Sequence, residues 1–255
     1  MARRTGRPGG VFIAGESPLV EEYAAACIAA GMTVEVRFNS APGGRLPAGA
    51  RRALGARRDA RIALELTNTS GEAKRKNLRA MDRALPEGTP LLSASAAITV
   101  AEQSGWIAGW HRLVGIAALP TLLGGSLVEL AGAPSVAPVV IAAAREFFRA
   151  IGKEVAIVGD TPGMVLPRIL CMLVNEAHFA LGERIAPGDD IDTAMKLGTN
   201  YPRGPLEWGA AIGYGHVRAV LEGLQRSTGE ERYRTAPLLA RRGNAFSHNV
   251  EGMPL

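Results

Sequence analysis

The chain has 255 residues, of which 47% are hydrophobic, and a formal net charge of +5 at pH 7. That length is sufficient for one large or two modest domains with an apolar core. No apolar run of about 18 residues is free of charge and proline, so the sequence predicts no membrane span. A strand-like segment follows the basic first residues directly, without the apolar region of a cleavable signal, and we expect a cytoplasmic protein.

The cysteines and the basic residues narrow the class of protein further. Cys27 and Cys171 each lie in a helical apolar pattern, and we predict buried, reduced side chains rather than a disulfide or a metal site. The positive charge is concentrated in residues 45–61 and 74–76. Nucleic-acid binding is not favoured, because no recognition motif accompanies the charge and only 5% of the residues are aromatic. A phosphate-bearing small molecule, such as a CoA thioester or a dinucleotide, fits the charge better, and a merely solvated basic surface is its commoner meaning.

The first part of the chain alternates short apolar runs with helical patterns, which is the order of a dinucleotide-binding fold. The predicted strands cover residues 11–15, 33–38, 61–66, 91–93, 113–116, 127–130 and 154–158. The predicted helices of this part cover residues 19–30, 50–57 and 135–151, and a Lys/Arg-rich segment that ends at Leu85. After Pro162 only helices are predicted, over residues 165–181, 189–197, 204–212 and 216–228. We therefore expect an α/β domain over residues 1–159 and an all-α domain over residues 160–255.

The turn after the first predicted strand carries the candidate cofactor-binding residues. A dinucleotide turn needs one glycine for the tight turn, one for approach to the pyrophosphate and one for helix–strand packing. Gly15 takes the first position, whereas Ser17 and Val20 take the other two, and Glu16 places a negative charge where a pyrophosphate would lie. Phe38 stands where an acidic residue usually binds the adenine ribose. The pattern favours a structural turn over a tight NAD site.

Four segments in the last third of the chain carry a resemblance to a known family. In their order and spacing, residues 160–165 (DTPGMV), 173–177 (LVNEA), 190–192 (DID) and 201–207 (YPRGPLE) resemble the C-terminal helical domain of the 3-hydroxyacyl-CoA dehydrogenases, including the 3-hydroxybutyryl-CoA dehydrogenases. The resemblance implies a Rossmann-like α/β domain followed by an all-α dimerisation domain, with a homodimer formed through the helices. We expect these motifs to be caps, turns and packing residues.

The resemblance also implies a catalytic pair, a His near the end of one strand and a Glu twelve residues later, which exchange and stabilise the hydroxyl proton. Glu129 falls where the family has its Glu, and Ala117 takes the position of the His. Residues 93–97 (SASAA) replace the polar run that touches substrate and cofactor, and Pro167 replaces an Asn. Glu129 is therefore the catalytic group that the resemblance carries over to this chain, and a structural role for it is the commoner meaning of a lone carboxylate.

Other polar residues are weaker candidates. Glu65 resembles the family's acidic residue at the end of the strand before the Lys-rich helix. Lys74 in that helix is a candidate contact for a CoA phosphate, although an exposed basic helix is the commoner meaning of such a segment. None of the histidines has a spacing that argues for catalysis, and those in the helical domain are expected on helix surfaces or in local bonds. The histidines are His111, His178, His216 and His248.

Two functional hypotheses remain open. The first is a diverged member of the family that lacks the usual His–Glu mechanism and binds a CoA thioester or a nucleotide as a dimer. The second is an active NAD-dependent 3-hydroxyacyl-CoA dehydrogenase in which Glu129 and water handle the proton. NAD is weakly supported, and no metal is expected. An open groove over Gly15 would favour the enzyme, and a groove filled by Val20 and Phe38 would favour the binding protein.

Overall fold

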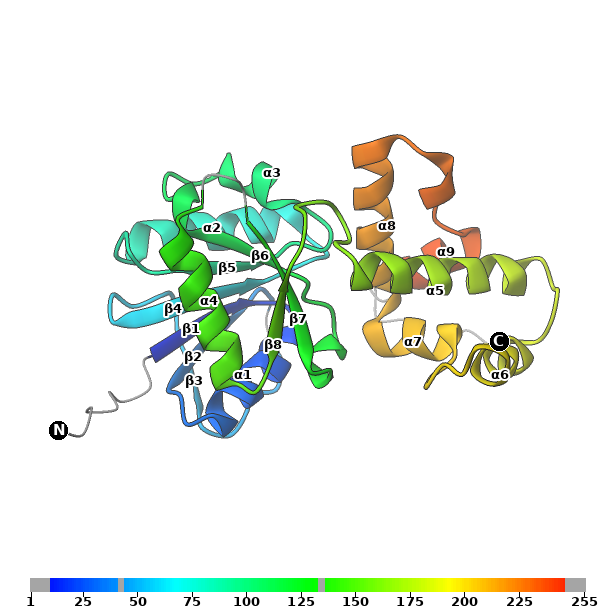
Figure 1. Cartoon of the computed structure of the whole chain (residues 1–255), viewed down its shortest axis with the longest axis horizontal. Helices are drawn as coiled ribbons and strands as arrows, with labels where there is room; N and C mark the ends of the chain where they lie inside the picture. Colours follow the sequence, from blue (N-terminus) through cyan, green and yellow to red (C-terminus); the bar gives the residue numbers. More distant parts are fainter. Residues whose placement is uncertain (1–9, 41–43, 133–135, 246–255) are drawn as a thin grey trace.

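A single mixed sheet organises the first part of the chain in the computed structural model, which describes residues 10–40, 44–132 and 136–245 (Figure 1). Within these residues the sheet has eight strands in the order β3-β2-β1-β4-β5-β6-β7-β8. Neighbouring strands are parallel except β6 and β7, which are antiparallel. The strands are β1 (Gly10–Gly15), β2 (Val34–Phe38), β3 (Ala50–Arg52), β4 (Ala60–Leu66), β5 (Leu91–Ala94), β6 (Leu113–Ile116), β7 (Leu127–Gly132) and β8 (Glu154–Ile157).

Helices cover both faces of the sheet. Helices α1 (Leu19–Ala29) and α4 (Pro138–Ala150) pack on one face, and α2 (Gly71–Ala84) and α3 (Val100–Ser104) pack on the other. Because side chains of a strand alternate between the faces, Ile13 of β1 joins the first core and Phe12 joins the second. Strand β1 is therefore buried along almost its whole length, as expected for a strand covered on both sides.

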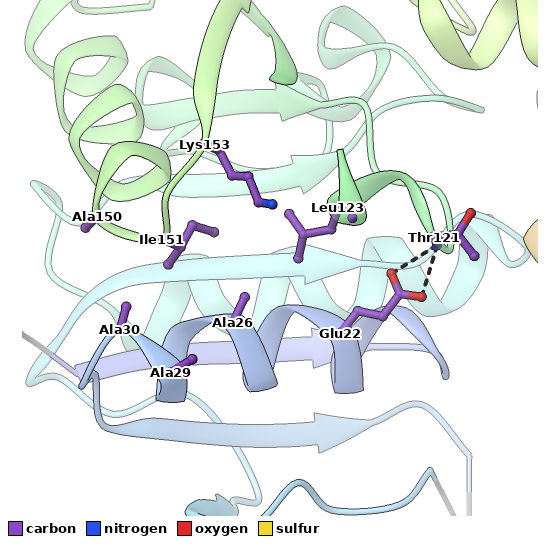
Figure 2. Close-up of a pocket in the computed structure, with 10 residues that line it drawn as sticks. Glu22, Ala26, Ala29, Ala30, Thr121, Leu123, Ala150, Ile151 and Lys153 are labelled. Atoms are coloured by element: carbon purple, nitrogen blue, oxygen red, sulfur yellow. Dashed lines mark hydrogen bonds between the residues drawn. The ribbon is translucent and has the colours of Figure 1, made fainter. Parts of the chain in front are cut away.

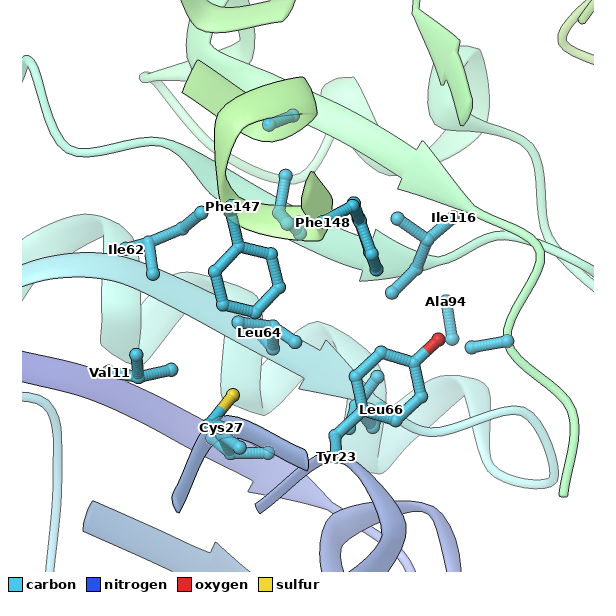
Figure 3. Close-up of a cluster of buried hydrophobic side chains, with 14 of the residues drawn as sticks. Val11, Tyr23, Cys27, Ile62, Leu64, Leu66, Ala94, Ile116, Phe147 and Phe148 are labelled. Atoms are coloured by element: carbon cyan, nitrogen blue, oxygen red, sulfur yellow. The ribbon is translucent and has the colours of Figure 1, made fainter. Parts of the chain in front are cut away.

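The core under α1 and α4 is dense and aromatic. Phe147 and Phe148 of α4 meet the sheet beside Tyr23 and Cys27 of α1 (Figure 3). The two phenylalanine rings stand edge to face, with centroids 5.1 Å apart. This contact fixes α4, and with it the start of β8, against the sheet.

The order of the strands reverses next to β1. From β1 the chain runs outward to β2 and β3 and then returns to form β4 on the other side of β1. Gly15 and Leu66, the last residues of β1 and β4, are partners in the pairing. In open α/β sheets ligands bind at the carboxyl ends of the strands at such a reversal, so the fold itself marks this edge for the site.

The second part of the chain is a bundle of helices, called the helical domain below. Its helices are α5 (Leu166–Gly182), α6 (Gly188–Thr199), α7 (Pro205–Ile212), α8 (Tyr214–Thr228) and α9 (Pro237–Ala245). Its core also takes in Ala96 and Leu119, which come from loops at the carboxyl edge of the sheet. Gly223 of α8 lies so close to the sheet domain that a Cβ there would meet the carbonyl oxygen of Ala97 at 2.3 Å. The two parts therefore pack directly against each other at the edge that holds the candidate site.

The motifs of the helical domain are architectural, as the sequence predicted. Asp192 accepts hydrogen bonds from two backbone N–H groups in the first turn of α7, at 2.8 and 3.0 Å. Asn175 donates to the carbonyl of Arg234 at 3.0 Å and accepts from the N–H of Ala236 at 2.8 Å. These residues tie helices together.

Some predicted elements are wrong. Residues 50–57 do not form a helix: Ala50–Arg52 is the edge strand β3, which pairs with β2, and Arg51 and Arg52 are exposed. An exposed edge strand tolerates the same run of arginines as a basic helix, so the pattern was ambiguous. Helices α3 and α9 were not predicted either. Strand β8 ends at Ile157 and α5 begins at Leu166, and the division near residue 160 stays a prediction.

Among the described helices, none is both long and apolar enough to cross a bilayer.

Candidate functional site

The candidate cofactor residues lie at the carboxyl ends of β1 and β4, called the crevice below. Gly15 ends β1, and a Cβ on it would lie 2.3 Å from the carbonyl oxygen of Leu66. Close packing of the two strand ends therefore requires this glycine whether or not a ligand binds. Ser17 donates its hydroxyl to Glu21 at 2.7 Å, and Val20 points into the core. The turn is held together by its own side chains.

Glu16 spans the crevice. Its carboxylate accepts hydrogen bonds from the backbone N–H of Asn68 at 2.7 Å, from the backbone N–H of Thr69 at 3.3 Å and from the Thr69 hydroxyl at 2.6 Å. On its other side, Nδ1 of His216 in α8 lies 3.4 Å from the carboxylate. The Glu16 carboxylate thus joins the loop after β1, the loop after β4 and the helical domain.

His216 meets Glu16 as a neutral ring. The side chain is buried, and burial lowers its pKa, although the negative charge of Glu16 opposes this shift. The 3.4 Å contact is within ion-pair range, yet Nδ1 has no hydrogen-bond partner among the described residues. Because the cost of burying a charged ring outweighs the attraction, we take the imidazole as neutral at pH 7. The sequence-based expectation that His216 lies on a helix surface is wrong.

The ribose end of the crevice is also internally bonded. The amide of Asn39 donates to the Thr67 hydroxyl at 2.8 Å and accepts from Asn77 at 2.8 Å. Phe38 is partly buried, and the guanidinium of Arg52 lies 5.2 Å above the centre of its ring. The Glu16 carboxylate already uses the donors of Asn68 and Thr69, so a nicotinamide dinucleotide binds here only after this carboxylate moves. It is Glu16, rather than Val20, that closes the crevice.

Glu65 and Lys74 form a buried ion pair beneath the crevice, and both side chains are fully buried. The Lys74 ammonium donates to Glu65, to the hydroxyl of Ser93 at 3.1 Å and to the carbonyl of Ala94 at 2.7 Å. All three of its protons therefore have partners. The expectation of an exposed basic helix is wrong at Lys74, and its ammonium has no free proton for a CoA phosphate in this structure.

Glu129 and Ala117, the two positions that the resemblance assigns to the catalytic pair, lie together. The N–H of Ala117 donates to the carbonyl of Glu129 at 3.0 Å, and both residues line a pocket of about 160 Å³. The Glu129 carboxylate accepts from the backbone N–H groups of Val165 at 2.8 Å and Leu166 at 2.7 Å, at the start of α5. Negative charge is favourable at a helix N-terminus, so Glu129 also has a structural role. The residues that line the pocket include no histidine.

Tyr23 is a polar residue of this pocket that sequence reasoning missed. Its ring is buried in the core, and its hydroxyl points toward Ala94 (Figure 3). Burial raises the pKa of the phenol, with smaller contributions from Glu22 and Cys27, so the hydroxyl keeps its proton at neutral pH. The signal was absent from the sequence because Tyr23 stands in a helical apolar pattern, where an aromatic residue indicates core.

A larger pocket of about 580 Å³ lies between α1 and the turn that precedes β8 (Figure 2). Glu22 in its wall accepts two hydrogen bonds from the N–H of Thr121, at 3.0 and 3.1 Å, and burial raises the pKa of this carboxyl. Lys153 donates to the carbonyl of Gly125 at 2.8 Å. None of the candidate site residues lines this pocket, and its charged groups have partners within the protein.

The cysteines are buried and free, as predicted. Burial raises the pKa of Cys27 to about 12 and that of Cys171 beyond it, so neither is a nucleophile. His178 is buried and makes the local bond that was one of its two expected placements: its Nδ1 contacts the carbonyl of Val174 at 2.8 Å. His111 lies 3.9 Å from an exposed Glu, and His248 is outside the described residues. In the described part of the chain, no three His, Cys, Asp or Glu side chains gather as a metal site.

Comparisons with known proteins connect both domains to one group of enzymes. Residues 163–249 match the family model described as 3-hydroxyacyl-CoA dehydrogenase, C-terminal domain. The 3-hydroxyadipyl-CoA dehydrogenase of Escherichia coli is 50% identical over 91 residues, which cover 36% of this chain and 19% of that protein. The probable 3-hydroxybutyryl-CoA dehydrogenase of Bacillus subtilis is 31% identical over 182 residues, 70% of this chain and 62% of that protein. The chain thus spans less than two thirds of the length of these relatives.

Solved structures agree with this relationship. The (S)-3-hydroxybutyryl-CoA dehydrogenase of Ralstonia eutropha superposes with a TM-score of 0.77 at 25% identity, over 94% of each chain. The 3-hydroxybutyryl-CoA dehydrogenase of Escherichia coli K12 gives a TM-score of 0.75 at 21% identity, over 92% of this chain and 56% of that one, and supports the fold alone. The expected architecture, a Rossmann-like sheet domain followed by a helical domain, is confirmed.

Proposed function

We propose that the chain belongs to the 3-hydroxyacyl-CoA dehydrogenase family, and that it is a slow NAD-linked oxidoreductase of short 3-hydroxyacyl-CoA thioesters, of the 3-hydroxybutyryl-CoA dehydrogenase kind. The observation that carries the proposal is the place of Glu129. Its carboxylate lies at the edge of the sheet where the two domains meet, opposite position 117, in a fold that matches a 3-hydroxybutyryl-CoA dehydrogenase over 94% of both chains.

Glu129 is the group that remains for proton handling. The pocket beside it, of about 160 Å³, has room for a water molecule. We propose that such a water exchanges the proton of the substrate oxygen and that the Glu129 carboxylate orients it. A positioned general acid–base contributes about 10²–10⁴-fold to a rate, so a chain with Ala117 in place of an imidazole is expected to turn over slowly by about that factor.

The substrate class follows from the relatives and from charge. CoA carries several phosphates, and the segment after β2 presents exposed arginines at positions 45, 51 and 52 next to the sheet edge. Electrostatic attraction to such a segment raises the local concentration of an anionic ligand. We propose that the CoA phosphates meet these arginines.

A second candidate function is the binding of a thioester without redox chemistry. The specific observation that favours it is that the Glu16 carboxylate lies in the crevice, with Ala117 at the position of the proton carrier. In this second account Glu129 only caps α5. Both candidates require the thioester to bind, and they differ in whether reduced nicotinamide is consumed.

A homodimer is part of the proposal. Around the start of α5 lie exposed apolar side chains, with Val165 50%, Leu166 47% and Ile169 56% exposed. Ile185 and Leu197 of the same domain are 71% and 82% exposed. Exposed large apolar side chains such as those around the start of α5 are candidates for an interaction surface. We propose that two copies pair through this face of the helical domain.

The test has two measurements on the full chain. Calorimetric titration with acetoacetyl-CoA reports thioester binding, and the absorbance of reduced nicotinamide reports oxidation in its presence. Binding together with slow, thioester-dependent oxidation supports the oxidoreductase. Binding without any oxidation supports the second candidate, and a failure of acetoacetyl-CoA to bind contradicts both.

A further inference from the structure

The contacts of Glu16 fit a role in ligand selection better than a role in the turn alone. A residue in this turn normally leaves the crevice free, because the dinucleotide passes over the end of β1. Here a carboxylate takes three hydrogen bonds from the facing loop, two of them at 2.7 Å or shorter. It is also mostly buried: the side chain of Glu16 is 14% exposed.

The backbone N–H groups that Glu16 uses are anion donors. Those of Asn68 and Thr69 both point into the crevice from the loop after β4. Backbone N–H groups at the carboxyl edge of such a sheet commonly meet phosphates. In this chain these N–H groups already bind the Glu16 carboxylate. A pyrophosphate would therefore find its donors occupied and a negative charge beside it. Repulsion between like charges is strong where water is largely excluded.

His216 packs beside the carboxylate. It reaches the crevice from α8, and its buried imidazole lies against Glu16 at 3.4 Å. Gly215, just before it, faces Thr69 of the same loop, and a Cβ at this glycine would lie 3.8 Å from the Thr69 methyl group. The helical domain therefore packs against both Glu16 and the loop that binds it.

We infer that Glu16 is a specificity-determining residue that weakens the binding of a dinucleotide's pyrophosphate in the crevice. A nicotinamide dinucleotide enters only when the carboxylate gives up the N–H groups of Asn68 and Thr69 and separates from His216. In the proposed function the CoA phosphates meet the arginines at positions 45, 51 and 52, so we expect the thioester not to compete with Glu16 for these donors. This inference rests on the proposed function for the identity of the dinucleotide, and its geometry stands on the contacts of Glu16 alone.

The experiment is a fluorescence titration of the full chain with NADH, for the wild type and three variants. Glu16→Gln keeps the size of the side chain and removes its charge, and Glu16→Ala also frees the backbone donors. Glu22→Gln is the matched control, since it removes a carboxylate six residues further along, from a side chain that binds Thr121 outside the crevice. A thermal melt of each variant verifies folding, and the nearly isosteric Gln variant serves if the Ala variant is unstable.

The expected result is an NADH dissociation constant at least about tenfold lower for both Glu16 variants than for the wild type, with Glu22→Gln unchanged. Equal dissociation constants for wild type and Glu16 variants overturn the inference, whether all of them bind tightly or none binds. Acetoacetyl-CoA affinity is expected to stay the same in every variant. A Glu16 variant that binds NADH tightly but never oxidises it with acetoacetyl-CoA leaves the inference intact and contradicts the proposed oxidoreductase, so the two failures are distinct.

Discussion

The backbone N–H of Ala117, the residue just after β6, donates a hydrogen bond to the carbonyl oxygen of Glu129 in the antiparallel strand β7, at 3.0 Å. Residues that face each other in this way carry their side chains on the same side of a sheet, with Cβ atoms about 4.5–5.5 Å apart. A side chain at position 117 therefore projects beside Glu129, into the pocket that both residues line.

Ala117→His is expected to raise the rate of thioester-dependent NADH oxidation. An imidazole at position 117 would lie within reach of the Glu129 carboxylate and supply the missing proton carrier, a contribution of about 10²–10⁴-fold. Steady-state kinetics with acetoacetyl-CoA measure the gain. Ala117→Gln, of comparable volume but without a titrating ring, is the control and should show no gain. Loss of the gain in Ala117→His combined with Glu129→Gln would show that the pair acts together.

Glu129→Ala is expected to destabilise the fold by about 1–3 kcal/mol, because it leaves two backbone N–H groups at the start of α5 without their acceptor. Glu129→Gln should cost less, since one side-chain oxygen remains. Urea unfolding measures both free energies. Equal stability of wild type and Glu129→Ala would contradict the capping role.

The losses of unfolding free energy caused by substitutions at Glu65 and Lys74 are expected to be strongly coupled. Removing one partner of a buried ion pair typically costs about 3–5 kcal/mol, because the other charge stays buried alone. Lys74→Met and Glu65→Gln should each be strongly destabilising, and the double variant should lose less than the sum. A double-mutant cycle in urea measures this, and additive losses would mean that the two side chains do not interact.

Acidification is expected to destabilise the protein through His178 and His216. Burial is the main cause that lowers both pKa values below the ordinary 6.5, so the folded state binds fewer protons than the unfolded state. Their contribution to stability is complete above pH 6.5 and is lost as the pH falls through the lowered pKa values. Denaturant unfolding at a series of pH values measures the slope. His178→Gln should flatten it, and an unchanged slope would contradict the assignment.

Ile169→Lys is expected to separate the proposed dimer into monomers. Ile169 is 56% exposed, so a charge there is harmless in a monomer and costly within an apolar interface. Light scattering after size-exclusion chromatography gives the mass. The control is Arg226→Lys in α8, which conserves the positive charge at a position away from this face. A wild-type chain that elutes as a monomer would refute the dimer.

The sequence predicted the main strands and helices because their apolar periods are regular, and the family resemblance singled out positions 117 and 129 as a pair. It was wrong at Arg51 and Arg52, where a run of exposed charges is compatible with an edge strand as well as a helix. It did not predict that Lys74 is buried, because only tertiary contact with Glu65 and Ala94 makes that burial tolerable. It recognised the unfavourable charge of Glu16 but not its partners, which come from a loop 52 residues away and from the helical domain.

The most direct test of the proposed function is a long incubation of the wild-type chain with acetoacetyl-CoA and NADH, followed by chromatographic analysis for 3-hydroxybutyryl-CoA. We expect a product that depends on the chain, forms slowly, and forms more slowly still with Glu129→Gln. Absence of 3-hydroxybutyryl-CoA with the wild type and with Ala117→His, while acetoacetyl-CoA binds to both, would contradict the oxidoreductase and leave thioester binding as the function.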